Sequence, residues 1–223
     1  MSARGADAAS FGPPAWRGQR GRTEVWYATF TDAASGTGGW VHAETVAPTD
    51  GSSPYAHGWV AVFPADRSPS VERFGPAPIE PQGAAWFRAG DVIVDDGRLR
   101  GRAGSIAWDL TLEDSGPPLF TFPRTVWERH LLPAAQIVPW PSARVRGTLT
   151  VAGEERTVDG RGALARIYGH GNAERWGWLH APLDEDGGVL EIVAATARRR
   201  SLRRLRPLAM VQLREPGLPD WPS

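Results

Sequence analysis

Apolar and polar residues alternate over short stretches of this chain, and no stretch keeps the spacing of three to four residues that marks an amphipathic helix. The clearest case is 106–113, where Ile106, Trp108, Leu110 and Leu112 are separated by Ala, Asp and Thr. A period of two places such apolar side chains on one face of a strand. The pattern therefore predicts a protein built from half-buried strands.

The predicted strands are separated by turns rich in Gly, Pro and Asp. They span residues 24–30, 40–46, 57–63, 71–74, 85–88, 91–94, 98–102, 105–113, 144–151, 156–167, 189–196 and 208–213. Residues 114–142 contain many Pro and are predicted to form a long loop, with weak helical potential at 125–132. The chain is thus expected to be all-β, an antiparallel barrel or sandwich over residues 23–215 between a flexible tail (1–22) and a short one (216–223).

The stretch 168–180 has an unusual composition for a strand. If it is extended throughout, alternate side chains share one face. That face combines two imidazoles, a carboxylate, an amide, a phenol and two indoles: Tyr168, His170, Asn172, Glu174, Trp176, Trp178 and His180. The set resembles the wall of a site more than a packing surface, although the Gly residues at 169 and 171 could also mark a bulge that breaks the alternation.

A second strand repeats the pattern, with Trp40, His42 and Glu44 on one face. If that face points inward, both sets converge in one cavity. If it points outward, Val41, Ala43 and Thr45 fill the interior instead, and the sequence does not decide between the two. We also count the indoles of Trp26 and Trp59, on neighbouring predicted strands, among the substrate-binding residues. Glu191 lies in an apolar strand and is expected on the barrel exterior.

Composition narrows the functional classes. The 223 residues include 25 basic and 25 acidic side chains, so net charge does not favour nucleic acid or an anionic membrane as a partner. Without Cys, the chain has no disulfide, zinc-thiolate site or catalytic thiol. The N-terminus lacks the apolar core of a signal peptide, and no run approaches the roughly 20 apolar residues of a membrane span, so cytoplasmic residence is expected. A homodimer is left open.

Several chemistries lack their motifs. His170, Glu174 and His180 could be assembled into a metal site, but the i, i+4 spacing suits a helix that this stretch does not form, so no metal is predicted. There is no G-x-S-x-G nucleophile elbow and no phosphate-binding or dinucleotide-binding Gly pattern, so no cofactor is predicted. The Arg run at 198–206 fits a solvated hairpin tip, with binding of phosphate, RNA or an anionic membrane surface as the alternative.

The second half resembles a known superfamily. Residues 146–151 read Arg-Gly-Thr-Leu-Thr-Val and are followed by Gly153, by 158–160 (Val-Asp-Gly), by Tyr168-x-His170-x-Asn172 and by Arg175-Trp176-x-Trp178. These motifs are similar to those of the lipocalin-like superfamily of carotenoid 1,2-hydratase (hydroxyneurosporene synthase) and tocopherol cyclase. His170 takes the place of an acidic residue in that pattern. Members usually contain two consecutive lipocalin-like (calycin-type) barrels, and this chain ends about where the second would begin.

The resemblance implies cofactor-independent hydration, cyclisation or isomerisation of an apolar polyene, isoprenoid or polyketide-type substrate. His170 and Glu174 would then perform acid–base catalysis, with Tyr168 and Asn172 orienting them. Trp176, Trp178 and Trp40 would form the walls of the site, because indole faces stabilise a carbocation. The alternative is a carrier that binds an apolar small molecule without changing it, which needs apolar walls but no buried acid.

Overall fold

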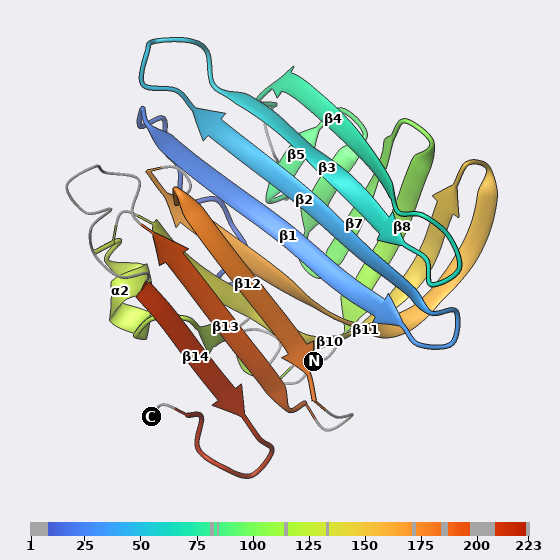
Figure 1. Ribbon diagram of the computed structural model, residues 1–223. Coiled ribbons are helices and arrows are strands. Elements are labelled where there is room, and N and C mark those ends of the chain that lie inside the picture. Colours follow the sequence, from blue (N-terminus) through green and yellow to red (C-terminus); the bar gives the residue numbers. More distant parts are fainter. Residues whose placement is uncertain are drawn as a thin grey trace.

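The computed structural model describes residues 9–80, 83, 85–113, 116–132, 134–170, 173–183, 187–196 and 208–221. Two antiparallel sheets make up most of it (Figure 1). The strands are β1 (Arg22–Asp32), β2 (Thr37–Ala47), β3 (Tyr55–Phe63), β4 (Ser70–Pro78), β5 (Phe87–Ala89), β6 (Val92–Asp95), β7 (Arg98–Ala103), β8 (Ile106–Glu113), β9 (Leu119–Phe120), β10 (Ala134–Val151), β11 (Glu154–Gly169), β12 (Arg175–Pro182), β13 (Val189–Thr196) and β14 (Leu208–Arg214). Helix α2 spans Arg124–Glu128.

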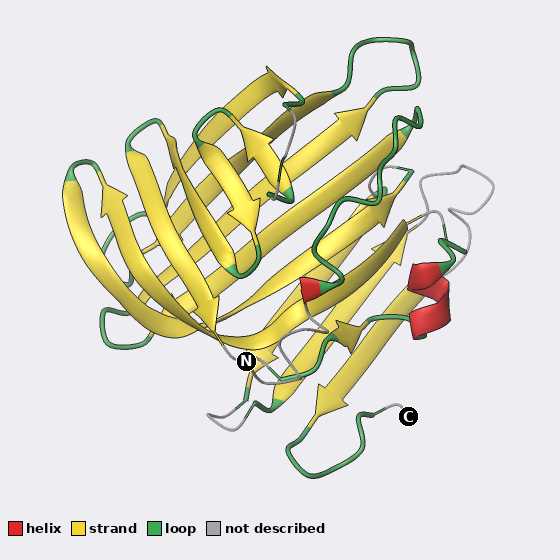
Figure 2. Ribbon diagram, turned by 180° about the vertical axis from the view of Figure 1, so that it is seen from behind, coloured by secondary structure: helices red, strands yellow, loops and turns green. Residues whose placement is uncertain are grey.

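The larger sheet forms a nearly closed barrel, which confirms the predicted fold class. Its strands follow the order β4-β3-β2-β1-β11-β10-β8-β7-β6-β5, with β9 paired to β10 beside this path, and β4 contacts β5 and β7. Figure 2 shows the strongly curved sheet that results. The predicted alternation of 106–113 is present in β8, where Ile106, Trp108, Leu110 and Leu112 are buried. Large side chains from many strands fill the interior, including Trp26, Phe87, Leu99, Trp140 and Leu164. The inside of the barrel is therefore a packed core.

Strand β10 differs from the prediction of a loop over 114–142. It begins at Ala134 and runs along β11 with register shifts between Ile137 and Trp140 and between Trp140 and Ala143. Pro139 and Pro141 lie within these two irregular steps. Because Pro cannot donate to a ladder, strands accommodate it at bulges, and a Pro-rich sequence can look like a loop.

Residues 9–21, which the sequence placed in a flexible tail, pack against one end of the barrel. The side chain of Phe11 is buried, and the Trp26 indole donates a hydrogen bond to the Gly12 carbonyl (2.9 Å). Arg166 donates to the Phe11 carbonyl (2.6 Å) and forms a buried ion pair with Glu24. Glu24 also accepts the backbone N–H of Ala15 (2.5 Å). These contacts anchor the segment to the first strand of the barrel.

The second sheet, with the order β12-β13-β14, lies against the outside of the barrel (Figure 1). Val189 of β13 packs with Val25 and Tyr27 of β1 and with Ala163 and Ala165 of β11. Those barrel residues alternate with the interior residues of the same strands. Where the second sheet covers them, β1 and β11 are consequently buried on both faces, one in the barrel core and the other beneath that sheet.

The stretch 168–180 does not form one strand. Strand β11 ends at Gly169 and β12 begins at Arg175 in the other sheet, so Tyr168 belongs to the barrel while Trp176, Trp178 and His180 belong to the second sheet. The prediction of one shared face for all seven residues is wrong, because the chain leaves the barrel between them. Among the described residues, no helix is long and apolar enough to cross a membrane.

Candidate functional site

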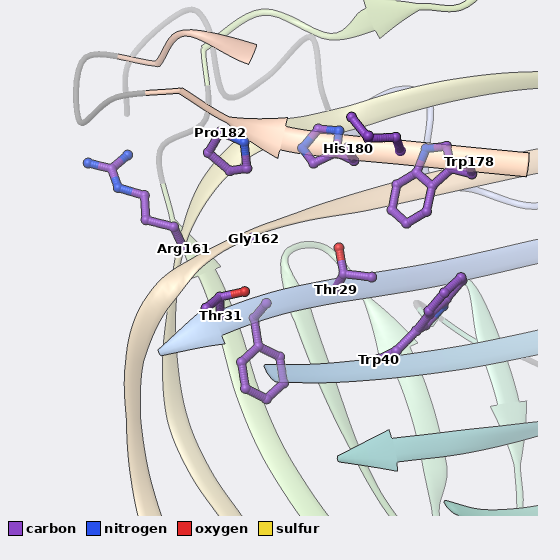
Figure 3. A pocket seen from close by; sticks show the side chains of 10 residues that line it. Thr29, Thr31, Trp40, Arg161, Gly162, Trp178, His180 and Pro182 are labelled. Atoms are coloured by element: carbon purple, nitrogen blue, oxygen red, sulfur yellow. The ribbon is translucent and has the colours of Figure 1, made fainter. Parts of the chain in front are cut away.

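A cleft of about 290 Å³ lies between the outer face of the barrel and strand β12 (Figure 3). Thr29 and Thr31 of β1, Trp40 of β2 and Arg161 of β11 line the barrel side. Trp178, Leu179, His180 and Pro182 of β12 line the opposite side. The volume is near the lower end of the range for small-molecule pockets, roughly 300 to 1,000 Å³.

An aromatic cluster forms the inner end of this cleft. The ring centroids of Trp40 and Trp178 lie 5.5 Å apart, and those of Tyr27 and Trp178 lie 5.0 Å apart in a T-shaped pair with an interplanar angle of 87°. Trp59 extends the cluster across β3, 5.1 Å from Trp40 and stacked on His42 at 5.2 Å. The distances are typical of favourable aromatic pairs. Indole faces from both sheets thus meet at one site.

Glu191 of β13 lies behind Trp178 and is only 1% exposed. One carboxyl oxygen accepts hydrogen bonds from the Gln136 amide (2.6 Å) and the Trp178 indole N–H (2.8 Å). The other lies 2.7 Å from Nδ1 of His180, whose side chain is 2% exposed. A buried carboxyl needs this degree of compensation, since an unpaired charge there would be strongly unfavourable.

The contacts of His180 fix the number of protons in this network. Its Nδ1 faces the carboxyl of Glu191, and its Nε2 faces the backbone carbonyl of Pro141, also at 2.7 Å. A neutral imidazole has one donor and one acceptor nitrogen, so two oxygen partners require either an imidazolium beside a carboxylate or a neutral ring beside a protonated carboxyl. In both arrangements the pair holds one proton that can be transferred.

Tyr27 borders the same network. Burial raises the pKa of its phenol well above the usual range, and the nearby charge of Glu191 raises that pKa further. The ring is 5% exposed and packs against Trp40, Trp178 and His42. The phenol is therefore neutral over the physiological pH range.

A second polar group, outside the cleft, continues from the aromatic cluster. Glu44 lies 3.4 Å from Nε2 of His42 and 3.5 Å from Nε2 of His57. Burial lowers the pKa of His57, with Glu44 acting in the opposite direction and His42 and Arg73 adding to the decrease. Among the residues that the structure describes, no group of three His, Asp or Glu side chains is arranged to hold a metal ion.

The structure brings together part of the predicted site. Trp40, Trp59, His42, Trp178 and His180 lie in or beside the aromatic cluster, with Glu44 next to His42. The face of β2 that carries Trp40, His42 and Glu44 points outward. Val41 and Ala43, on the opposite face, belong to the barrel core. Part of each predicted set meets on the outer surface of the barrel, Trp40 and His42 from one and Trp178 and His180 from the other.

Other predicted residues lie elsewhere. Trp26 is fully buried in the barrel core, and Tyr168 packs at the barrel end with Phe11 and Trp127. His170 is exposed and contacts Arg22; Glu174 is also exposed, and Trp176 is 58% exposed. None of these five lines the cleft. Asn172 and the Arg run at 198–206 lie outside the described residues.

The sequence reasoning passed over Glu191 as a site residue, although a signal for it exists. The sequence 184–188, rich in Asp and Gly, is typical of a turn, and pairing the flanking residues outward from it places Pro182 opposite Val189 and His180 opposite Glu191, which is the observed register. Counting residues outward from the turn of a hairpin therefore predicts that His180 pairs with Glu191. Tyr27 and Gln136 carry no comparable signal, because they approach from strands far away in the sequence.

Comparison with known proteins identifies the fold of this chain but not its activity. No family model matches the chain. Two uncharacterized proteins of Mycobacterium tuberculosis, from strains CDC 1551 / Oshkosh and ATCC 25618 / H37Rv, are each 54% identical to it over 212 residues. The alignment covers 94% of this chain and 64% of each relative, so the chain spans less than two thirds of their length.

Solved structures with low sequence identity are similar in three dimensions. An AttH-like protein from Nitrosomonas europaea has a TM-score of 0.62 at 19% identity, covering 87% of this chain and 65% of that one. Kievitone hydratase from Nectria haematococca has a TM-score of 0.57 at 13% identity, covering 89% and 62%. CghA with Sch210972 has a TM-score of 0.60 at 14% identity, covering 88% and 58%. The chain shares their lipocalin-like barrel fold.

Proposed function

We propose that the cleft binds an apolar, unsaturated small molecule of the polyene, isoprenoid or polyketide type. The protein would promote hydration, cyclisation or isomerisation of this molecule without a cofactor. The observation that carries the proposal is the His180–Glu191 pair, a buried group holding one transferable proton in the wall of a cleft lined by indoles. The motif resemblance to carotenoid hydratase and tocopherol cyclase, and the fold shared with a hydratase, support the same class of chemistry.

Protonation of a carbon–carbon double bond needs an acid that is kept away from bulk water. In the proposed reaction the substrate replaces the Pro141 carbonyl as the partner of the Nε2–H of His180, and the alkene carbon takes that proton. His180 becomes neutral and keeps its bond to Glu191. The positive charge develops on the adjacent carbon, next to the faces of Trp178 and Trp40, each of which can contribute about 0.5 to 2 kcal/mol of cation–π stabilisation.

The cation has three outcomes, and each returns one proton to His180. Attack by water followed by loss of a water proton gives the hydrated product. Attack by a second double bond of the same molecule followed by loss of a C–H proton gives a ring. Loss of a different C–H proton without either attack gives an isomer. The pair therefore acts in turn as acid and base in all three reactions.

A non-catalytic carrier is the second candidate, and one observation favours it. The described structure already provides a protein partner for both nitrogens of His180 and for both oxygens of Glu191. A network that is complete without a ligand can serve to hold β12 against the barrel and to orient Trp178. A carrier would use the cleft and the aromatic cluster but not the proton.

The two candidates are separated by binding and turnover measured on the same variants. Native mass spectrometry of the purified protein would identify co-purified apolar molecules, and calorimetry with geraniol and retinol would measure binding. Trp40→Ala should weaken that binding. Turnover of the bound molecule would be followed by liquid chromatography and mass spectrometry, as a mass gain of one water or as an isobaric product.

For the enzyme, Glu191→Gln and His180→Gln should reduce turnover by about 10² to 10⁴-fold while binding persists. Glu174→Gln is the matched comparison, because it makes the same change on an exposed carboxyl outside the cleft. Loss of turnover in Glu174→Gln alone would move the acid back to the position predicted from the sequence. Ligands that bind and are recovered unchanged would support the carrier.

A further inference from the structure

The second sheet distributes its side chains unusually between its two faces. The inner face, toward the barrel, carries His180, Glu191 and Gln212, and each of these polar side chains forms a hydrogen bond there. In an antiparallel sheet with one face toward solvent, apolar residues are normally inside and polar residues outside. Part of the polar content of this sheet thus lies inside, and its outward face has the opposite composition.

The register of the three strands identifies the residues of this outward face. Leu179 of β12 pairs with Ile192 of β13, which pairs with Val211 of β14, so one row of outward side chains crosses the whole sheet. The rows on either side are Gly177, Ala194 and Ala209, and Ala181, Leu190 and Leu213. At these nine positions no side chain carries a charge or a hydrogen-bonding group. The outward face is therefore a continuous apolar surface.

Trp221 extends this apolar surface beyond β14. Its backbone exchanges two hydrogen bonds of 2.8 Å with Leu213, so the two side chains lie on the same face. Trp221 is 59% exposed and Leu179 is 47% exposed. The larger residues between them, Leu190, Ile192, Val211 and Leu213, are outside the hydrophobic clusters that pack in and against the barrel. Figure 1 shows the sheet from this side, and no described segment crosses it.

The size of the surface indicates what can cover it. Its residues expose on the order of 600 Å² in one copy of the chain, at the upper end for the largest apolar patch of a monomeric protein. Two such surfaces in contact would bury roughly 1,200 Å², which is the lower limit for a stable and specific protein–protein interface. A second copy of the same face is therefore a partner of sufficient area.

We propose that the outward face of the second sheet binds the same face of a second copy of this chain, so that two three-stranded sheets stack as a sandwich. A flat face without charges offers no group that would select an unlike, charged partner, and it is complementary to itself about a two-fold axis. Stacked sheets pack about 10 Å apart with interdigitating side chains. The cleft lies on the inner side of the sheet, so the contact does not involve Trp178 or His180.

The test is sedimentation velocity of the full chain over a range of concentrations. Because the interface is at the lower limit of size, the native protein should change from monomer to dimer with a dissociation constant of about 1 to 100 µM. The contact has no charged groups, so raising the NaCl concentration should not weaken the dimer.

Two variants locate the contact. Ile192→Glu places a charge in the middle of the face and should raise the dissociation constant at least about 100-fold, since a buried unpaired charge is strongly unfavourable. Trp221→Ala removes a large aromatic side chain from the side of the face and should raise it about ten-fold. Val71→Glu is the matched control, because Val71 is an apolar residue of β4 that is 56% exposed on the barrel. It should leave the dimer unchanged.

Chemical cross-linking decides the matter if Ile192→Glu does not fold. The chain has no Cys, so Ala194→Cys and Val71→Cys each supply a single thiol, one on the outward face of β13 and one on the barrel. A short bismaleimide should link Ala194→Cys into a dimer and leave Val71→Cys unlinked. Equal linkage of the two variants would overturn the proposal.

Two other results would also overturn it. A dimer that persists in Ile192→Glu with the native affinity would place the contact elsewhere on the molecule. A native protein that stays monomeric at all concentrations would exclude a second copy as the occupant. If that monomer bound phosphatidylcholine vesicles and Ile192→Glu did not, the face would be a lipid-binding surface instead.

Discussion

Glu24 and Glu191 are both buried carboxyl groups, and the unfavourable free energy of burying their charge is offset by different partners. Each is 1% exposed, and each accepts several hydrogen bonds. Glu24, at the end of the barrel, is paired with Arg166, which lies over the rings of Trp26 and Trp127. Glu191, between the two sheets, is paired with His180.

The identity of the partner separates the two roles. Burial lowers the pKa of Arg166, and Glu24 acts against that decrease, but an arginine in a protein does not release its proton. The Glu24–Arg166 pair is therefore a fixed connection between the N-terminal segment and the barrel. An imidazole, unlike a guanidinium, can release and regain a proton within a protein, so of these two pairs the one at the cleft is suited to acid–base chemistry.

The largest expected effect is on the fixed pair. Arg166→Met would leave Glu24 buried without a cation, and removing one partner of a buried ion pair costs about 3 to 5 kcal/mol of unfolding free energy. Urea unfolding followed by circular dichroism would measure it. The double variant Glu24→Leu with Arg166→Met should recover most of the loss. If the single variant unfolds like the native protein, the pair does not anchor the N-terminal segment.

A smaller loss of stability is expected at the cleft. Glu191→Gln keeps the shape of the side chain and a carbonyl oxygen for the indole of Trp178, so the same unfolding measurement should show a loss of about 1 to 3 kcal/mol. A loss of unfolding free energy as large as that of Arg166→Met would mean that the Glu191–His180 pair stabilises the fold as much as the Glu24–Arg166 pair does, against the proposed difference in their roles. Stability close to that of the native protein, together with lost turnover, would support that difference.

The smallest effect concerns pH. Because burial lowers the pKa of His57 in the folded protein, the neutral imidazole is favoured there. This contribution to stability is present above the unfolded pKa of about 6.5 and is lost as pH falls through the lower folded value. Stability measured between pH 7.5 and 5 should decline less steeply in His57→Gln than in the native protein. An identical slope would contradict the assignment to His57, which Glu44, His42 and Arg73 surround.

How far the sequence could predict the molecule depended on whether the deciding contacts were local. Alternation within 106–113 predicted β8, because one side of that strand is buried and the other is not. On β2 the alternation could not decide which face points inward, since the second sheet covers part of the outer face as well. Val41 packs in the barrel core, and Trp40 packs on the opposite face of β2 against the cluster beneath the second sheet.

The site was harder to predict for the same reason. Trp40, Trp178 and His180 were identified as candidates by their residue types. They come together because the chain leaves the barrel after β11 and β12 lies over the outer surface of the barrel. The pairing of His180 with Glu191 follows from a hairpin register that counting can supply. Tyr27 and Gln136 come close to Glu191 only because the two sheets pack together, and the residues around them in the sequence do not predict that contact.

The alternation of inward and outward side chains on β1 and β2 also bears on how such a protein can diversify. Thr29, Thr31 and Trp40 face the cleft, whereas Ala28 and Val41, their neighbours in sequence, belong to the barrel core. Substitutions at one parity can reshape the ligand surface, and substitutions at the other parity affect folding. Adjacent codons in these strands are thus under separate physical constraints, and a library restricted to the outward positions could change specificity on an unaltered scaffold.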